Sequence, residues 1–165
     1  MTCHLFPYGV EMEDGSTPRL SERQEEIWRN WLRLNTLLPA HLNRQLQVDD
    51  GLSLPDFDVL VQLTDSPEGR LRVTELARAL EWERSRLSHH VGRMQRAGLV
   101  CREECETDRR GAFVVLTKQG RAAIERAAPV HVRTVRRLFV DALSEQEIEA
   151  LDATTTKLLA RLGRS

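Results

Sequence analysis

Residues 73–117 constrain the fold of this 165-residue chain more than any other stretch. A short helix is predicted at residues 73–80, and a turn followed by a longer helix lies within residues 81–100. Two β-rich runs follow at 99–105 and 113–117, around a turn-forming run at 107–111. Helical periodicity marks the two helices, and β-branched and aromatic residues mark the strands. The pattern predicts a winged helix-turn-helix. The fold class is therefore mainly α with a small β-hairpin wing, plus N- and C-terminal dimerisation helices.

The longer helix separates into an apolar and a polar face. At 100° per residue, Leu87, Val91 and Met94 form one inward stripe. The polar side chains that this leaves for the outer face are Ser85, Arg86, Ser88, His89 and Arg93. Arginine can fork onto guanine, and serine and histidine can bond base edges, so we predict that this face contacts DNA, with Arg86 and His89 first. The alternative is an ordinary solvated helix face.

The turn between the two strands carries paired arginines, Arg109 and Arg110, before Gly111. Arginines at a hairpin tip suit the negative potential of a minor groove. Asp108 lies two residues before Arg110 and can hold that guanidinium in place. We therefore add Asp108, Arg109 and Arg110 to the predicted DNA-binding residues.

With these motifs the chain resembles the MarR family of winged-helix regulators. The resemblance rests on residues 74–77 (TELA), 85–91 (SRLSHHV), 98–100 (GLV), 108–111 (DRRG) and 116–120 (LTKQG). The wing motif is the most specific, and in the family its Asp and the Arg two residues later form a pair that maps to Asp108 and Arg110. The resemblance implies a homodimeric DNA-binding regulator, usually a repressor, acting on an inverted-repeat operator of double-stranded DNA.

The resemblance also implies a small aromatic or phenolic effector, since such regulators often bind one between the dimer frame and the reading module. The candidate pocket residues are Trp28, Trp31, His41 and Phe57. The alternative is core and dimer packing, because aromatic residues at helical spacing most often belong to a core.

The flanking sequence predicts a helical frame. Residues 1–19 are expected to form a flexible tail, and residues 20–163 a single domain with dimerisation helices at 20–48 and 118–163 around a winged-helix module at 53–117. Capping residues are predicted at Ser21, Ser53, Thr74, Thr117 and Ser144, with helices running to about Leu46 and Leu143. Inward-facing residues predicted after Ser53 are Phe57, Leu60, Val61 and Thr64, and a short strand is predicted at 71–73.

Charge is unevenly distributed along the chain. Arg70 to Arg121 holds 12 Arg and Lys against 7 Asp and Glu, although the whole chain has a formal net charge of -1. A basic module on an acidic frame fits DNA binding. We find no catalytic motif and expect no enzyme activity, cofactor or metal site. No signal peptide or membrane span is evident, which favours a cytoplasmic protein.

Two further alternatives stay open. A winged helix can serve as a protein-interaction module without DNA binding. A thiol-based redox sensor would use Cys101 or Cys105, which lie about 13 Å apart on an extended strand, too far for a disulfide. We favour the simpler interpretation, in which these two cysteines are incidental and half-buried.

Overall fold

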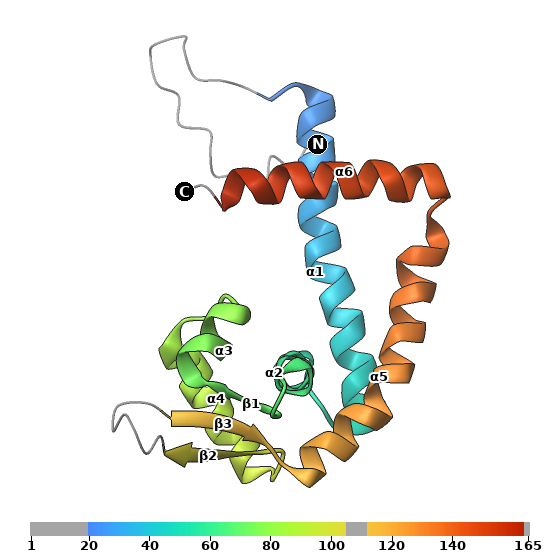
Figure 1. Cartoon of the computed structure of the whole chain (residues 1–165). Coiled ribbons are helices and arrows are strands. Elements are labelled where there is room, and N and C mark those ends of the chain that lie inside the picture. Colours follow the sequence, from blue (N-terminus) through green and yellow to red (C-terminus); the bar gives the residue numbers. More distant parts are fainter. Residues whose placement is uncertain (1–19, 105–111, 164–165) are drawn as a thin grey trace, which may run out of the picture. The chain divides into compact units, whose positions relative to one another are not determined.

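The computed structural model describes residues 20–104 and 112–163 (Figure 1). The elements in chain order are α1 Glu22–Asp50, α2 Leu54–Asp65, β1 Arg70–Arg72, α3 Val73–Ala79, α4 Arg84–Arg96, β2 Val100–Glu104, β3 Ala112–Leu116, α5 Lys118–Leu138, the 3-10 turn η1 Val140–Ala142 and α6 Glu145–Leu162. The chain divides into two compact units, Met1–Thr36 and Leu37–Ser165, so α1 begins in the first and ends in the second. The fold class is confirmed as mainly helical with a small antiparallel sheet. The predicted tail, residues 1–19, and the wing tip lie outside the described residues.

The sheet has three antiparallel strands in the order β1-β3-β2. Val114 of β3 is the central residue, paired with Leu71 on one side and Arg102 on the other. The strand predicted at 71–73 is therefore confirmed with a shift of one residue. Its last residue, Arg72, also precedes α3, which joins the sheet directly to the helix-turn-helix.

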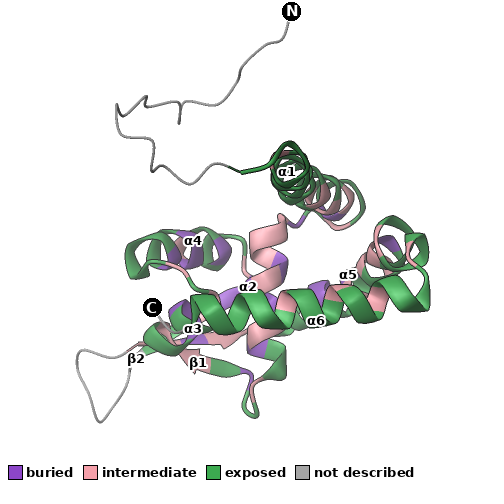
Figure 2. Ribbon diagram, turned by 90° about the horizontal axis from the view of Figure 1, so that it is seen from above, coloured by how far each residue is buried: buried purple, intermediate pink, exposed green. Residues whose placement is uncertain are grey.

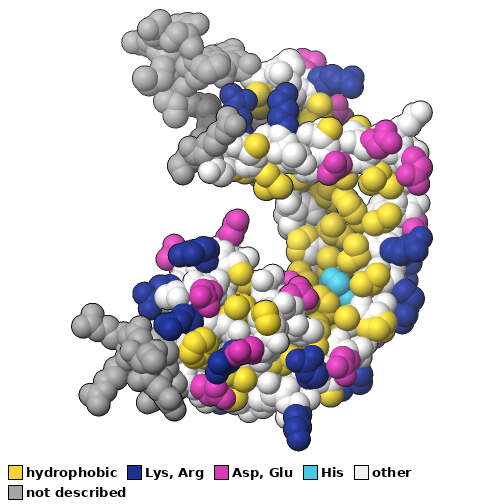
Figure 3. Space-filling model, in the orientation of Figure 1, with side chains coloured by type: hydrophobic (Ala, Val, Ile, Leu, Met, Phe, Trp, Pro, Cys, Tyr) yellow, Lys and Arg dark blue, Asp and Glu magenta, His cyan; other side chains and the backbone are white. Residues whose placement is uncertain are grey.

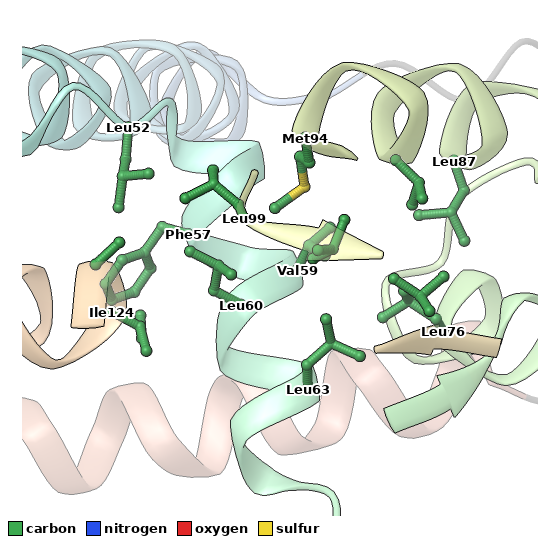
Figure 4. Close-up of a cluster of buried hydrophobic side chains, with 14 of the residues drawn as sticks. Leu52, Phe57, Val59, Leu60, Leu63, Leu76, Leu87, Met94, Leu99 and Ile124 are labelled. Carbon is green, nitrogen blue, oxygen red and sulfur yellow. The ribbon is translucent and has the colours of Figure 1, made fainter. Parts of the chain in front are cut away.

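One hydrophobic core holds α2, α3, α4, the sheet and the start of α5 together (Figure 4). Leu60 and Leu63 of α2, Leu76 of α3 and Leu87 of α4 are fully buried in it. Burying a leucine side chain stabilises a fold by about 1.5–3 kcal/mol, so this cluster fixes α4 against the rest of the module. Figure 2 shows the contrast with α6, where no residue is buried in the single chain.

The predicted helix starts are confirmed where the N-cap side chain bonds a backbone N–H a few residues later in sequence. Ser53, Thr117 and Ser144 each accept a hydrogen bond from the backbone N–H three residues later. Ser21 and Gln24 exchange the paired bonds of a capping box, as predicted. These helix starts depend on neighbours in sequence alone, which is why sequence patterns locate them.

Two predictions about α2 and α3 are wrong. Thr74 does not cap α3: the helix begins at Val73 after the extended Arg72, whose N–H donates to the Glu75 carboxylate. Thr64 is exposed, because Leu63 is buried in its place and offers more apolar surface.

Two predicted helix ends are also wrong. α1 continues past Leu46 to Asp50, and Gly51 follows it with φ +69°. α5 ends at Leu138 and not near Leu143, since Phe139 leaves helical geometry at φ -130°.

Candidate nucleic-acid interface

α4 is held by its apolar face and ends at a defined turn. Leu87, Val91 and Met94 are buried, which confirms the predicted stripe. Glu83 precedes the helix and makes no side-chain cap hydrogen bond. At the other end, Gly98 adopts φ +73° and the Leu99 N–H bonds the Met94 carbonyl, the arrangement of a Schellman motif. The helix is therefore fixed along its buried side and at its C-terminus.

The outward face of α4 carries the polar residues that the sequence predicted. Ser85, Arg86, Ser88, His89 and Arg93 are all exposed. The structure thus brings five of the eight predicted DNA-binding residues onto the surface of one helix. The other three, Asp108, Arg109 and Arg110, lie outside the described residues. Contact of these eight with DNA stays a prediction.

A basic hollow of about 380 Å³ lies beside this face. It is lined by Pro55, Trp82, Arg86, His89, His90, Arg93 and Arg96. Three arginines line it, and no acidic residue does. Such a concentration of positive charge attracts a phosphate backbone. The hollow therefore extends the candidate interface from α4 to the first turn of α2.

Sequence reasoning missed Arg102, which links the wing to α4. Its Nη2 donates to the Ser88 carbonyl oxygen at 2.9 Å and lies 3.0 Å from Ser88 Oγ. The two residues are 14 apart in sequence, so the contact exists only once β2 folds back along α4. Arg102 is exposed on a strand, and strand alternation was the one available signal. Arg102 connects a predicted DNA-binding serine to the base of the wing.

His90 lies on the flank of α4 and is only 5% exposed. Its Nδ1 lies 2.7 Å from Arg93 Nη2, and its Nε2 lies 2.9 Å from Asp56 Oδ1 in the first turn of α2. Burial raises the pKa of Asp56, but the contacts with His90 and Ser53 outweigh this effect, so that pKa lies below its ordinary value of 3.8. Asp56 therefore stays ionised and joins α2 to α4 through His90.

Asp56→Asn is expected to lower the free energy of unfolding by about 1–2 kcal/mol near neutral pH, because the capping carboxylate and its charge are lost. Since the folded-state pKa is depressed, the contribution of Asp56 is present above the unfolded pKa near 3.8 and is lost as pH falls through the folded value. Urea unfolding at pH 7 and across the acidic range measures both effects. Asp65→Asn, an exposed carboxylate at the other end of α2, is the control and should change stability by less than about 0.5 kcal/mol. An Asp56→Asn variant as stable as the parent chain at pH 7 would contradict the assignment.

The four predicted pocket residues are not brought together by any described contact. Trp28 and Trp31 belong to the first unit and are 45% and 41% exposed. His41 is exposed, with Nδ1 2.9 Å from the Leu37 carbonyl oxygen. Phe57 is buried against the His131 ring, with centroids 4.3 Å apart, and burial lowers the pKa of His131. The hollow of about 310 Å³ between η1 and α6 contains none of the four. The effector pocket stays a prediction.

The remaining sequence predictions concern cysteine, metal and membrane. Cys101 is a half-buried free thiol on β2, and Cys105 lies outside the described residues. Within residues 20–104 and 112–163, no group of three His, Cys, Asp or Glu side chains is placed to hold a metal ion. In the same part of the chain, no helix is both long and apolar enough to cross a membrane.

A helix-turn-helix with an exposed polar second helix and an adjacent β-hairpin defines a winged-helix protein of the DNA-binding class. The model of the MarR family matches residues 50–111. AbsC, a MarR family transcriptional regulator from Streptomyces coelicolor, is 40% identical over 90% of this chain and all of its own, with a TM-score of 0.85. This chain belongs to the MarR family of transcriptional regulators.

Two further relatives concern DNA binding and repression. Sco3205, a MarR family regulator from the same organism crystallised with DNA, is 39% identical over 87% of this chain and 90% of its own, with a TM-score of 0.83. The transcriptional repressor MprA of Escherichia coli is 26% identical over 138 residues, which are 84% of this chain and 77% of MprA. These relatives are transcriptional regulators, a class without enzymatic function.

Proposed function

We propose that this chain is a homodimeric, sequence-specific repressor that binds an inverted-repeat operator through α4 and the wing. The observation that carries the proposal is the division of α4: Leu87, Val91 and Met94 are buried while five polar side chains are exposed on the other faces. Family membership and the DNA complex of Sco3205 support the same assignment. Each α4 would enter a major groove about one helical turn, roughly 34 Å, from its twin.

The dimer proposal rests on apolar surface that the single chain leaves exposed. Figure 3 shows hydrophobic side chains reaching the surface of the chain. The large ones in the two predicted dimerisation segments, 20–48 and 118–163, are Leu20, Ile27, Trp28, Trp31, Leu32, Leu34, Leu37, Val48, Val132, Leu138, Val140, Leu158, Leu159 and Leu162. Apolar side chains in this number on a soluble surface mark an interface. A second copy of the chain would cover them across a two-fold axis.

Repression follows from occupancy of a promoter, and MprA is named a repressor. We further propose that a small aromatic or phenolic effector releases the operator by changing the separation of the two modules. Trp28, Trp31, His41 and Phe57 are its candidate contacts. Since the two-fold frame fixes the separation of the two α4 helices, a small change there costs affinity at both half-sites.

The test is a fluorescence titration and footprint of the full chain on the DNA upstream of its own gene. A specific regulator should protect an inverted repeat, bind it at least about 1,000-fold more tightly than random duplex, and lose affinity linearly in log–log plots against salt. Light scattering should give a dimer. An interaction module without DNA binding would show almost no affinity for either duplex at low salt, and that result would overturn the proposal.

Arg110→Ala is expected to weaken operator binding about 5- to 100-fold while the dimer stays intact, because a minor-groove arginine is lost and the frame is untouched. The same titration, with light scattering alongside, measures both. Arg126→Ala serves as the control, because it removes the same charge from an exposed position on α5, outside α4 and the wing. Equal weakening by the two variants would show that net charge alone, and not the wing, accounts for the loss.

A further inference from the structure

Two of the predicted DNA-contacting arginines are braced by side chains from outside the exposed face of α4. The first is Arg86, whose Cζ lies 4.4 Å from the centroid of the Trp82 ring. Trp82 lies two residues before α4 and is half-buried. A guanidinium is attracted to the face of an indole ring, so this contact favours one placement of Arg86.

Trp82 is itself fixed by His90. The two rings meet edge to face, with centroids 5.3 Å apart and planes at 84°. Trp82, Arg86 and His90 follow one another at intervals of four residues, and His90 is almost fully buried. The indole thus lies between a buried ring and an exposed guanidinium, and its position determines where Arg86 can lie.

The second braced arginine is Arg93, which depends on the tautomer of His90. A guanidinium has only N–H donors, so Nδ1 of His90 must accept from Arg93 Nη2 at 2.7 Å. The other ring nitrogen of His90, Nε2, faces Asp56 Oδ1 at 2.9 Å. Asp56 is anchored in turn, because its carboxylate accepts from the Ser53 N–H at 2.9 Å. A continuous polar chain therefore leads from the start of α2 to Arg93.

Bracing matters because Arg86, Arg93 and Arg96 line the same basic hollow and repel one another. A free arginine also loses side-chain entropy when DNA immobilises it. Contacts made before DNA arrives remove part of both costs. The gain is greatest for the contacts that must have one geometry, which are base contacts.

We propose that Trp82, His90 and Asp56 are positioning residues that hold Arg86 and Arg93 ready for DNA and so raise specificity for the operator. This inference rests on the proposed function. It adds that specificity depends on residues that need not touch DNA. Trp82 acts through Arg86, and Asp56 acts through His90 on Arg93.

Double-mutant cycles on operator binding test this coupling. Trp82→Leu is expected to weaken operator binding about 3- to 10-fold in the parent chain and less than about 1.5-fold when Arg86 is already alanine. His90→Gln keeps a donor toward Asp56, places no acceptor at Nδ1 and removes the ring that meets Trp82. Its loss should therefore shrink when Arg93 is alanine and nearly vanish when Arg86 is alanine as well. His90→Asn keeps an oxygen near the Nδ1 position and should retain more of the affinity than His90→Gln. If Trp82→Leu and His90→Gln weaken binding as much in the alanine backgrounds as in the parent chain, their role is structural only, and the proposal is overturned.

A readout without DNA separates this inference from the proposed function. Side-chain ¹⁵N relaxation of the free protein should show Arg86 and Arg93 more ordered than the exposed Arg84 on the same helix. Trp82→Leu should release Arg86, and His90→Gln should release Arg93. If the two arginines are ordered in a chain that binds no duplex, the proposed DNA-binding function is overturned and the positioning role stands. If the chain binds the operator but Arg86 and Arg93 are as mobile as Arg84, the positioning role is overturned and the DNA-binding function stands.

Discussion

Replacing Arg86 and Arg93 together by alanine is expected to remove most operator specificity while the fold and the dimer remain. Both side chains are exposed, so their truncation removes no apolar contact from the core; the one buried partner affected is His90 Nδ1, which loses its donor Arg93 Nη2. A good arginine contact to a base is worth about 1–3 kcal/mol of discrimination, and two such contacts give about 2–6 kcal/mol, or roughly 30- to 20,000-fold in affinity. Affinity for random duplex should fall far less, because the remaining basic residues still reach phosphates.

The measurement is a paired titration of operator and random duplex at one salt concentration, with thermal unfolding as a check on the fold. Lys118→Ala combined with Arg126→Ala gives the matched control, since it removes two exposed charges from α5 and none from α4. The control should weaken both duplexes by a similar small factor. An unchanged ratio of operator to random affinity in the Arg86 and Arg93 variant would show that the exposed face of α4 does not recognise sequence.

Gly120→Ala is expected to cause a large loss of stability, although it adds only one methyl group. A Cβ at Gly120 would lie 2.0 Å from the Leu99 carbonyl oxygen and 2.9 Å from Leu116 Cδ1. The backbone cannot readily move away, because the Leu99 carbonyl accepts from the Thr117 N–H and the Gly120 N–H donates to Thr117 Oγ1. We expect a loss of about 3 kcal/mol or more, which lowers Tm by roughly 6–12 °C.

Gly92→Ala is the matched control for Gly120→Ala. A Cβ at Gly92 would meet nothing within 4 Å, and alanine in a helix is favoured over glycine by about 0.5–1 kcal/mol. The two variants add the same methyl group and should move Tm in opposite directions. If Gly120→Ala unfolds at the same temperature as the parent chain, the close approach of α5 to Leu99 is not needed for the fold.

The candidate site was predicted from sequence where it depends on one helix. The spacing of Leu87, Val91 and Met94 places all three on one side of α4. Helical periodicity therefore separated the buried face from the exposed face. Boundaries were less accurate when a distant element decided them. α3 starts at Val73 because β1 delivers Arg72 in an extended conformation, and arginine is not a residue type that marks an N-cap in sequence. Thr64 gave way to Leu63 because the shape of the whole core selects which side of α2 is buried.

The sequence by itself determined the class of this protein: a winged helix-turn-helix with a polar reading face, because helical and strand periodicities and caps are set by near neighbours. Only the tertiary structure decided how that face is held. Arg102 meets Ser88, and Asp56 meets His90, across separations of 14 and 34 residues, which no local pattern encodes. Those contacts exist because burial of one shared core brings α2, α4 and β2 together, and their polar flanks then meet at its edge.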